Sequence, residues 1–426
     1  MKEKILSIIK NKRTVCFIMF AVTFLVFWIC SRHEFNSFNN YSYLADAVLH
    51  GTIDVTDMPE YLESVTFRGH KYMHFAPGVS WISIPFVLIF GLDKFNCSYL
   101  ALLLSAGNSV LAYLLLEKLN LGKSFKDRLF LTAMLVFGTV HFFCATQGNS
   151  WCLGHLATLF FLLLSFNFLH SSTDAEDIKK TYINLFLCGL FFGLAVNCRL
   201  SALLGAIYII AVIYRKYHFD YKAYIAFAAG AAIFGLIYMI YNLVRYGTIM
   251  DEGYSLTYLK DYHREEYDII QNAPFEEQRA LLKKYTKEFG GPLQARYVKY
   301  NLYSIFMMAP EFSWDPSPHL VPAIAGVSLT FTSPMLYAAV MAPKKQFNTI
   351  VLWITTVATA LPFLFNYGNG MSQFGMRYSM DFTPYLWILM CMGLTKGEKL
   401  KPWMKVGIVV CILVSLWGTQ YWNKYY

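Results

Sequence analysis

Long apolar runs recur along the whole chain, and short clusters of lysine and arginine separate them. About eleven of these runs approach the roughly 20 residues that an α-helix needs to cross a membrane. Only 15% of the 426 residues are charged, whereas a soluble domain carries about 25%. The pattern predicts an all-α polytopic membrane protein and excludes disordered, collagen-like and small disulfide-rich chains. The predicted spans lie near residues 14–31, 98–117, 129–147, 152–169, 182–197, 200–214, 223–243, 325–342, 348–366, 381–395 and 403–420.

The basic clusters between these spans all alternate onto one side, which the positive-inside rule identifies as cytoplasmic. We therefore expect a plasma-membrane protein with a cytoplasmic N-terminus and an external C-terminus. The lysines and arginines that set this orientation also account for the net charge of +9, so we exclude a nucleic-acid partner. The clusters that share this side are Lys2, Lys4, Lys10, Lys12 and Arg13; Lys118, Lys123, Lys126 and Arg128; Lys179 and Lys180; Arg215, Lys216 and Lys222; Lys344 and Lys345; and Lys396, Lys399, Lys401 and Lys405.

Two features of the sequence limit other interpretations. The first apolar run follows a basic stretch, as in a signal peptide, but no small-residue cleavage site comes after it. We expect an uncleaved first span.

The nine cysteines form no Cys-x-x-Cys pair and lie mostly in apolar runs, so we expect neither a disulfide framework nor a zinc site. Nothing in the sequence requires a cofactor, and a divalent metal ion stays open.

Two external segments are long enough to form a domain on the outer face of the membrane. The expected division is a transmembrane module, 1–243, that includes the first outer loop (32–97), then a second outer loop, 244–324, and the C-terminal spans, 325–426. In the first loop, residues 79–92 would reverse the charge alternation if they crossed the membrane, so we expect an interfacial helix there.

Smaller elements are expected within the two outer loops. Apolar residues of 41–50 recur at helical spacing, which predicts an amphipathic helix. Residues 258–289 are rich in charged residues and tyrosine and predict surface helices. Residues 310–322 contain four prolines and predict an ordered, extended loop.

Charged and polar side chains near the outer ends of the spans are candidates for function, because burying them in lipid costs a few kcal/mol. Glu34 follows the first span and has the chemistry of a general base. Arg199 and Arg377 offer planar donors that suit a phosphate. His155, next to Trp151, begins the fourth span.

Each of these candidates also has an ordinary structural interpretation. Interface carboxylates are commonly only hydrated, arginines extend toward lipid headgroups, and an aromatic residue with a histidine anchors a helix at the interface. The loop acids are further possible substrate contacts that are more often simply solvated: Asp54, Asp57, Glu60, Glu63, Asp251 and Glu252.

Several short motifs resemble the polyprenyl-phosphate-dependent GT-C glycosyltransferases, which include protein O-mannosyltransferases and lipid A aminoarabinose transferases. Residues 43–51 (YLADAVLHG) resemble the first outer-loop helix of that group, and residues 69–78 (GHKYMHFAPG) its second outer-loop element. Residues 241–247 with Gly253 and Tyr254 resemble the exit from its seventh span. Residues 375–378 (GMRY), with Asp381 and Pro384, resemble its late arginine motif.

The resemblance implies a GT-C-like fold with about eleven spans and two long outer loops that carry interfacial helices. It also implies phosphate contacts from Arg377, Arg199 and Lys71. The group places an Asp-Glu pair after the first span, but that position falls near Ser37 and Phe38, neither of which is a base. The expected base is then Glu34, Asp46 or another outer carboxylate, unless the protein has lost catalysis. The further site candidates are His155, Tyr72, His74, Tyr378 and Asp381.

The implied activity is the inverting transfer of a sugar from a polyprenyl-phosphate donor to a hydroxyl of a glycan, lipid or protein at the outer membrane face. This reaction belongs to cell-envelope glycan or glycolipid modification. Two alternatives stay open: a catalytically silent GT-C relative that acts as a scaffold, and a transporter or flippase for lipid-linked saccharides. The apolar span interiors argue against ion-coupled transport.

Overall fold

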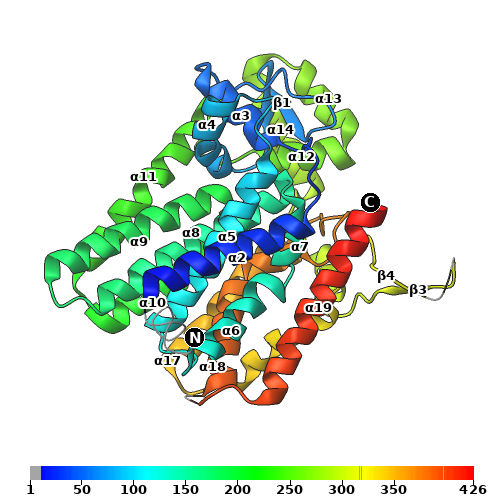
Figure 1. Cartoon of the computed structure of the whole chain (residues 1–426). Helices are drawn as coiled ribbons and strands as arrows, with labels where there is room; N and C mark the ends of the chain where they lie inside the picture. Colours follow the sequence, from blue (N-terminus) through cyan, green and yellow to red (C-terminus); the bar gives the residue numbers. More distant parts are fainter. Residues whose placement is uncertain (1–10, 316, 318, 397) are drawn as a thin grey trace.

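The structure is a computed structural model that describes residues 11–315, 317, 319–396 and 398–426, and it is almost entirely helical (Figure 1). Within these residues, eight helices are long and apolar enough to cross a membrane. This confirms the predicted class of polytopic helical membrane protein. The eight are α2 (Lys12–Cys30), α5 (Cys97–Lys118), α8 (Ser150–Thr173), α9 (Ile178–Cys198), η1 with α10 (Leu200–Tyr217), α11 (Tyr221–Tyr246), α17 (Phe347–Phe365) and α19 (Pro402–Tyr425).

Three of the expected spans differ from a single straight helix. Residues 129–147 form α6 (Phe125–Phe137) and α7 (His141–Gln147), which meet at a bend of 58° and make a ninth span if they are counted together. Residues 325–342 form the short α16 (Leu329–Thr332) and the 3-10 helix η3 (Pro334–Met341). Pro334 cannot donate a backbone hydrogen bond, so the α-helix ends before it.

The expected span at 381–395 is shortened to α18 (Thr383–Thr395), which follows the 3-10 helix η4 (Arg377–Asp381). All residues of α18 except Met392 are buried. Neighbouring helices therefore cover most of α18.

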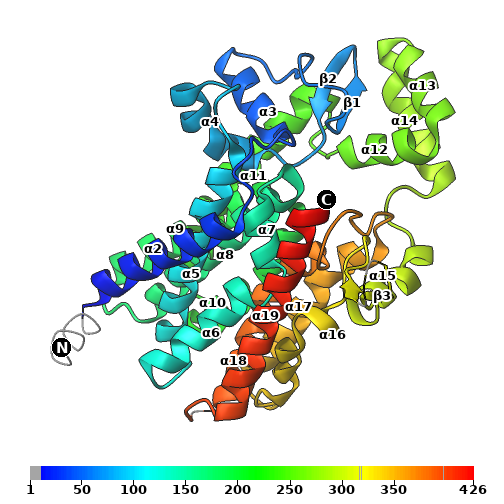
Figure 2. The same cartoon turned by 45° about the vertical axis from the view of Figure 1, so that its right-hand side comes forward.

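The outer loops fold into a small domain at one end of the bundle (Figure 2). The first loop supplies α3 (Asn40–Leu49), the hairpin β1 (Ser64–Phe67) and β2 (His70–Met73), and α4 (Gly78–Phe90). The second supplies α12 (Gly253–Tyr262), α13 (Arg264–Asn272) and α14 (Phe275–Phe289). Side chains from both loops share one core. That core includes Val65, Phe67, Tyr72, Tyr246, Leu256, Tyr258, Leu259, Tyr267, Ile270 and Leu282.

The segment that follows returns the chain to the bundle. It contains η2 (Ala295–Tyr297), α15 (Val298–Phe306) and a hairpin of β3 (Glu311–Ser313) and β4 (His319–Val321). The expected extended loop at 310–322 is therefore a β-hairpin. Pro310 and Pro322 lie just outside the paired residues, so neither occupies a ladder position that needs an N–H.

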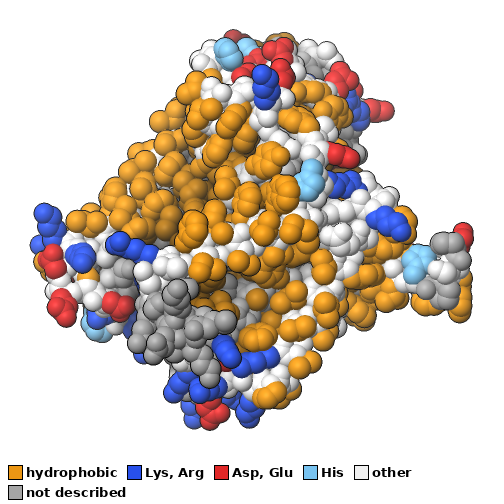
Figure 3. All heavy atoms as spheres, in the orientation of Figure 1, with side chains coloured by type: hydrophobic (Ala, Val, Ile, Leu, Met, Phe, Trp, Pro, Cys, Tyr) orange, Lys and Arg blue, Asp and Glu red, His pale blue; other side chains and the backbone are white. Residues whose placement is uncertain are grey.

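The two ends of the described chain lie on opposite faces of the bundle. Arg32, just after α2, donates hydrogen bonds to the carbonyls of Trp422 (3.0 Å) and Asn423 (2.6 Å), so the end of α2 meets the end of α19. In the view of Figure 3, many of the lysine and arginine side chains lie at the end of the molecule opposite α3 and α4. The expected cytoplasmic residues Lys2, Lys4 and Lys10 lie outside the described residues.

A buried ion pair joins α11 to the outer domain. Arg245 is fully buried, and its guanidinium donates to the carbonyl of Met73 (2.8 Å), to Asn242 (2.6 Å) and, at 3.5 Å, to Asp251. Tyr241 stacks on this guanidinium, with its ring centroid 3.9 Å from Cζ. The carboxylate of Asp251 also accepts hydrogen bonds from Tyr238 and from the backbone of Gly253. The Arg245–Asp251 pair thus holds the end of β2 and the start of α12 against the end of α11.

We expect Arg245→Met to lower the free energy of unfolding by about 3–5 kcal/mol, because it leaves the Asp251 carboxylate buried without its cation. Thermal unfolding in detergent, followed by a thiol-reactive dye that reaches the seven buried cysteines only on unfolding, measures this. The double variant Arg245→Met/Asp251→Asn should recover part of the loss. Strictly additive effects of the two changes would contradict a direct pairing.

Candidate functional site

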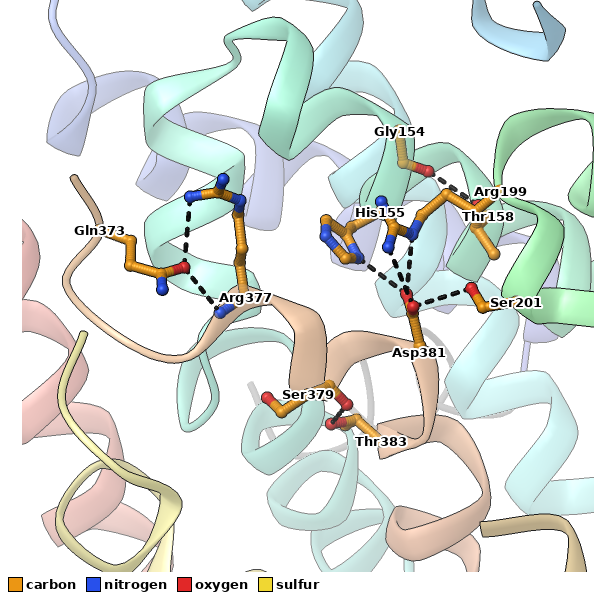
Figure 4. Close-up of polar contacts among 10 residues, drawn as sticks. All are labelled: Gly154, His155, Thr158, Arg199, Ser201, Gln373, Arg377, Ser379, Asp381 and Thr383. Carbon is orange, nitrogen blue, oxygen red and sulfur yellow. Dashed lines mark hydrogen bonds and ion pairs between the residues drawn. The ribbon is translucent and has the colours of Figure 1, made fainter. Parts of the chain in front are cut away.

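Asp381 is the centre of a buried polar cluster that joins three parts of the chain (Figure 4). Its two carboxylate oxygens accept from Nε (2.8 Å) and Nη2 (3.0 Å) of Arg199 in a bidentate pair. The hydroxyl of Ser201 donates to it at 2.7 Å, and Nδ1 of His155 lies 2.9 Å away. We call Asp381, Arg199, His155, Tyr378 and Arg377 the arginine cluster.

Local backbone geometry explains why these residues meet. Arg199 has an extended backbone (φ −154°) at the break between α9 and η1, which turns its side chain away from both helices. His155 lies within the first two turns of α8, and Asp381 ends η4 just before α18 begins. A carboxylate at this position is favoured by the positive end of the α18 dipole. Because α8 and α9 pack closely, His155 near the start of α8 and Arg199 after the end of α9 both reach Asp381.

Opposing effects set the charge of Asp381. Burial alone would raise the pKa of this carboxyl group, but the Arg199 guanidinium and the His155 ring hold it well below its usual value. Burial likewise opposes the charge on Arg199, but the Asp381 carboxylate raises the pKa of its guanidinium overall. Both groups are therefore ionised, and the charge of Arg199 is largely neutralised within the protein.

Arg377 differs from Arg199 because no carboxylate lies within 4 Å of its guanidinium in the described part of the chain. Its Nη1 donates, at 3.3 Å in each case, to the carbonyls of Gly370 and Met371 and to the side chain of Gln373. The residue is only 8% exposed. Isolated buried charges are costly, so this guanidinium is suited to an anion that the protein itself does not supply.

The two arginines flank one aromatic ring. The Cζ atoms of Arg199 and Arg377 lie 5.3 and 5.5 Å from the centroid of Tyr378, which stacks on Phe363. Figure 4 shows His155 between the two guanidinium groups. Nε2 of this buried histidine has no hydrogen-bond partner. The cluster can therefore present two guanidinium groups to a single small anion, with the Nε2 atom of His155 beside them as a hydrogen-bond acceptor.

A pair of acidic residues from the outer domain lies next to this cluster. The Glu63 carboxylate contacts Nε2 of His74 at 3.4 Å and accepts from the indole of Trp151 at 3.2 Å. Asp261 on α12 accepts from the hydroxyl of Tyr367 at 3.1 Å. Partial burial raises the pKa of Asp261, the Tyr367 hydrogen bond opposes this, and the Glu63 carboxylate raises it further. We call Glu63 and Asp261 the outer acidic pair.

Tyr367 donates its hydroxyl to Asp261 of the outer acidic pair and lies near Tyr378 of the arginine cluster. Burial raises the pKa of its hydroxyl, and the Asp261 carboxylate, Tyr378 and Glu63 are all close enough to raise it further. His74 is buried beside the pair, and burial lowers the pKa of its ring, although the carboxylates of Glu63, Asp251 and Asp261 partly oppose this. The site thus has a cationic part at the helix ends and an acidic part in the outer domain.

The structure brings together five of the residues that the sequence selected: Arg199, Arg377, His155, Tyr378 and Asp381. His74 lies in the acidic part of the same region.

The other sequence candidates lie outside these contacts. Glu34 is exposed in the loop after α2, and Asp46 is on the outer side of α3, where it faces His50 at 3.5 Å. Lys71 donates to the carbonyl of Met58 at 2.5 Å. Tyr72 packs edge-on against Tyr246 in the outer core.

Sequence reasoning missed Asp261, Tyr367 and Gln373 as site residues. It named Glu63 only as one of several loop acids. Nothing about Asp261 distinguishes it from the other acids of residues 258–289, because its role depends on where α12 packs against the bundle. Across the described ranges, no group of three or more histidine, cysteine, aspartate or glutamate side chains could hold a metal ion.

Comparisons with known proteins find similarity among solved structures but not among sequences. No sequence family and no curated protein matches this chain. Among solved structures, it is similar to the apo oligosaccharyltransferase of Archaeoglobus fulgidus, with 11% identity and a TM-score of 0.49. The match covers 96% of this chain and 55% of that chain, so this protein spans about half the length of the neighbour.

We expect Asp381→Asn to lower the free energy of unfolding by about 3–5 kcal/mol at neutral pH, because Arg199 loses its counter-charge. The folded pKa of Asp381 is depressed, so the stabilisation is complete above about pH 4 and is lost only as the pH falls through the lowered value. Unfolding midpoints of wild type and variant, measured from pH 7 to pH 3, test this. If the difference in unfolding midpoint between wild type and Asp381→Asn already shrinks near pH 6, the lowered pKa of Asp381 is contradicted.

Proposed function

We propose that this protein is an integral membrane glycosyltransferase of the GT-C type. It moves a sugar from a polyprenyl-phosphate donor to a hydroxyl acceptor at the outer face of the plasma membrane, in cell-envelope glycan or glycolipid modification. The observation that carries the proposal is the buried guanidinium of Arg377, which has no carboxylate partner in the described chain. It lies beside Arg199 at the end of the helix bundle where the outer domain packs.

Charge balance supports a donor with one phosphate group. Asp381 neutralises Arg199, so Arg377 supplies the one net positive charge of the cluster while His155 is neutral. A phosphodiester that joins a sugar to a polyprenol carries one negative charge. When the bond from the sugar carbon to the phosphate oxygen breaks, the departing phosphate gains a second negative charge. Arg377 and the outer edge of Arg199 then stabilise charge that develops in the transition state.

The outer acidic pair supplies the base in this proposal. Asp261 takes the proton from the acceptor hydroxyl, the acceptor oxygen bonds to the sugar carbon, and the phosphate leaves from the opposite side, which inverts that carbon. The raised pKa of Asp261 makes it a stronger base than an ordinary aspartate. Glu63, which is 45% exposed at its side chain, lies where an acceptor can enter.

The two bases expected from the sequence serve as controls. Glu34 and Asp46 contact neither the outer acidic pair nor the arginine cluster. Glu34→Gln and Asp46→Asn should therefore leave turnover within about twofold of wild type. Lys71 is a phosphate ligand in the family resemblance, but its hydrogen bond to Met58 is within the outer domain, so Lys71→Gln should have a small effect.

We expect Arg377→Ala to weaken binding of a polyprenyl phosphate at least tenfold and to lower kcat by about 100-fold, because its donors stabilise the departing phosphate. Arg377→Lys should recover only part of both losses, since lysine keeps the charge but not the planar fork. Scintillation proximity with labelled polyprenyl phosphate measures binding by the purified full chain. Equal binding by wild type and Arg377→Ala would overturn the phosphate site.

We expect Asp261→Asn to abolish transfer but to preserve binding of polyprenyl phosphate, because only proton removal is lost. In the wild type, transfer should fall as the pH drops through the Asp261 pKa, which lies above that of an ordinary aspartate. Transfer from a panel of polyprenyl-phosphate sugars to membrane glycolipids, followed by mass spectrometry, measures both. Bound polyprenyl phosphate without transfer from any donor would favour the catalytically silent alternative.

A further inference from the structure

A second polar groove lies on the outer domain, away from the site described above. It encloses about 740 Å³ between the end of α3, the β1–β2 hairpin, α4, the outer end of α11 and the start of α14. None of the residues of the arginine cluster or of the outer acidic pair lines it. The residues that line it are Val48, Gly51, Thr52, Ile53, Asp54, Arg68, His70, Tyr72, Trp81, Val244 and Phe275.

Arg68 in this groove has an unfavourable backbone conformation. Phe67 pairs with His70 across the hairpin, so Arg68 and Gly69 form the two-residue turn. Both have positive φ, 58° and 76°, which is typical of a type I′ turn, where Asn-Gly is the favoured pair. Arginine at the first turn position is strained, because its Cβ crowds the backbone in the left-handed region. Strain of this kind concentrates at functional positions.

The guanidinium of Arg68 contacts an aromatic ring of the outer domain. Its Cζ lies 3.8 Å from the centroid of Phe275, within the range of a cation–π interaction. Among the described residues, no carboxylate lies within 4 Å of it, and only its backbone N–H forms a hydrogen bond, to Gln278. The donor edge of the guanidinium is therefore available to a ligand.

The other charged groups of the groove are already paired. Asp54 accepts from Nδ1 of His70 (2.7 Å), the hydroxyl of Thr56 (2.6 Å) and the backbone of Lys71 (3.2 Å). Partial burial opposes its charge, but these hydrogen bonds lower the pKa of Asp54 overall. The ring N–H of Trp81 is buried and has no partner. The groove thus offers one cation, Arg68, that has no carboxylate partner among the described residues.

One end of the groove opens onto the apolar belt of the bundle. Val244 lines the groove and is 56% exposed, and Leu243 and Ile240 beside it on α11 are 50% and 60% exposed. On α4, the residues beyond Trp81 include Leu88 and Ile89, which are 68% and 72% exposed. Figure 3 shows hydrophobic side chains covering the flank formed by α9 and α11 up to α4. An acyl chain on this flank would place its headgroup at Arg68.

We propose that this groove binds the phosphate headgroup of an anionic phospholipid from the outer leaflet. The Arg68 guanidinium donates to the phosphate oxygens while the acyl chains lie along α4 and α11. Arginine binds phosphate through its planar fork. Charge complementarity favours an anionic over a zwitterionic phospholipid, because a choline cation beside the phosphate repels the same guanidinium. The groove is independent of the proposed transferase site, so its lipid binding does not require sugar transfer.

The test uses the purified full chain in detergent with added phosphatidylglycerol or phosphatidylcholine, and native mass spectrometry to measure retained lipid. Wild type should retain phosphatidylglycerol about tenfold more tightly than phosphatidylcholine. Arg68→Asn should lose most of this preference. Asparagine tolerates positive φ, so the variant should unfold at the same temperature as wild type or higher. The matched control Arg264→Gln removes an outer-domain arginine that is paired with Asp268, and it should keep the preference.

Lipids bound elsewhere on the protein are common to all variants, so the difference between wild type and Arg68→Asn isolates this groove. An unchanged preference in the folded Arg68→Asn variant would overturn the proposal. So would displacement of the lipid by glycerol phosphate at concentrations equal to those of the lipid, because the groove would then bind a soluble phosphate compound.

Discussion

The bidentate pair between Arg199 and Asp381 is the interaction on which the functional end of this molecule depends. Asp381 is 4% exposed at its side chain, and it accepts hydrogen bonds from η1 and from Arg199 and contacts His155 on α8. A carboxylate buried this deeply is stable only with such partners. Since η4 precedes α18 directly, the pair also fixes the entry to the most buried helix. The position of Arg377, four residues before Asp381, follows from the same constraint.

The proposed functions use two different ways of holding an arginine. Arg199 and Arg245 are each paired with a carboxylate, so both organise the structure, and Arg199 offers a ligand only its outer edge. Arg377 and Arg68 have no such partner in the described chain and are held instead by carbonyl oxygens or by an aromatic ring. Because an unpaired guanidinium keeps its attraction for anions, this distinction separates structural arginines from candidate binding groups.

In the outer domain, local sequence patterns predicted the helices, but they did not predict how those helices pack. The helical spacing in 41–50 and the charge-rich stretch 258–289 predicted helices that the structure contains. No local pattern indicated that Val65 and Phe67 from one loop would share a core with Leu256 from the other. That packing brings Asp261 close to Glu63. The sequence could therefore place both carboxylates in outer loops, but it could not pair them or assign either the role of a base.

The sequence by itself determined the membrane class and most of the spans, because hydropathy is a local property of each segment. It also selected Arg199, His155, Arg377, Tyr378 and Asp381 as individual candidates. Only the tertiary structure decided which of them meet, which arginine is left without a carboxylate, and that the runs at 325–342 and 381–395 are not long helices. These outcomes depend on packing between segments far apart in the chain, and no local pattern in the sequence encodes that packing.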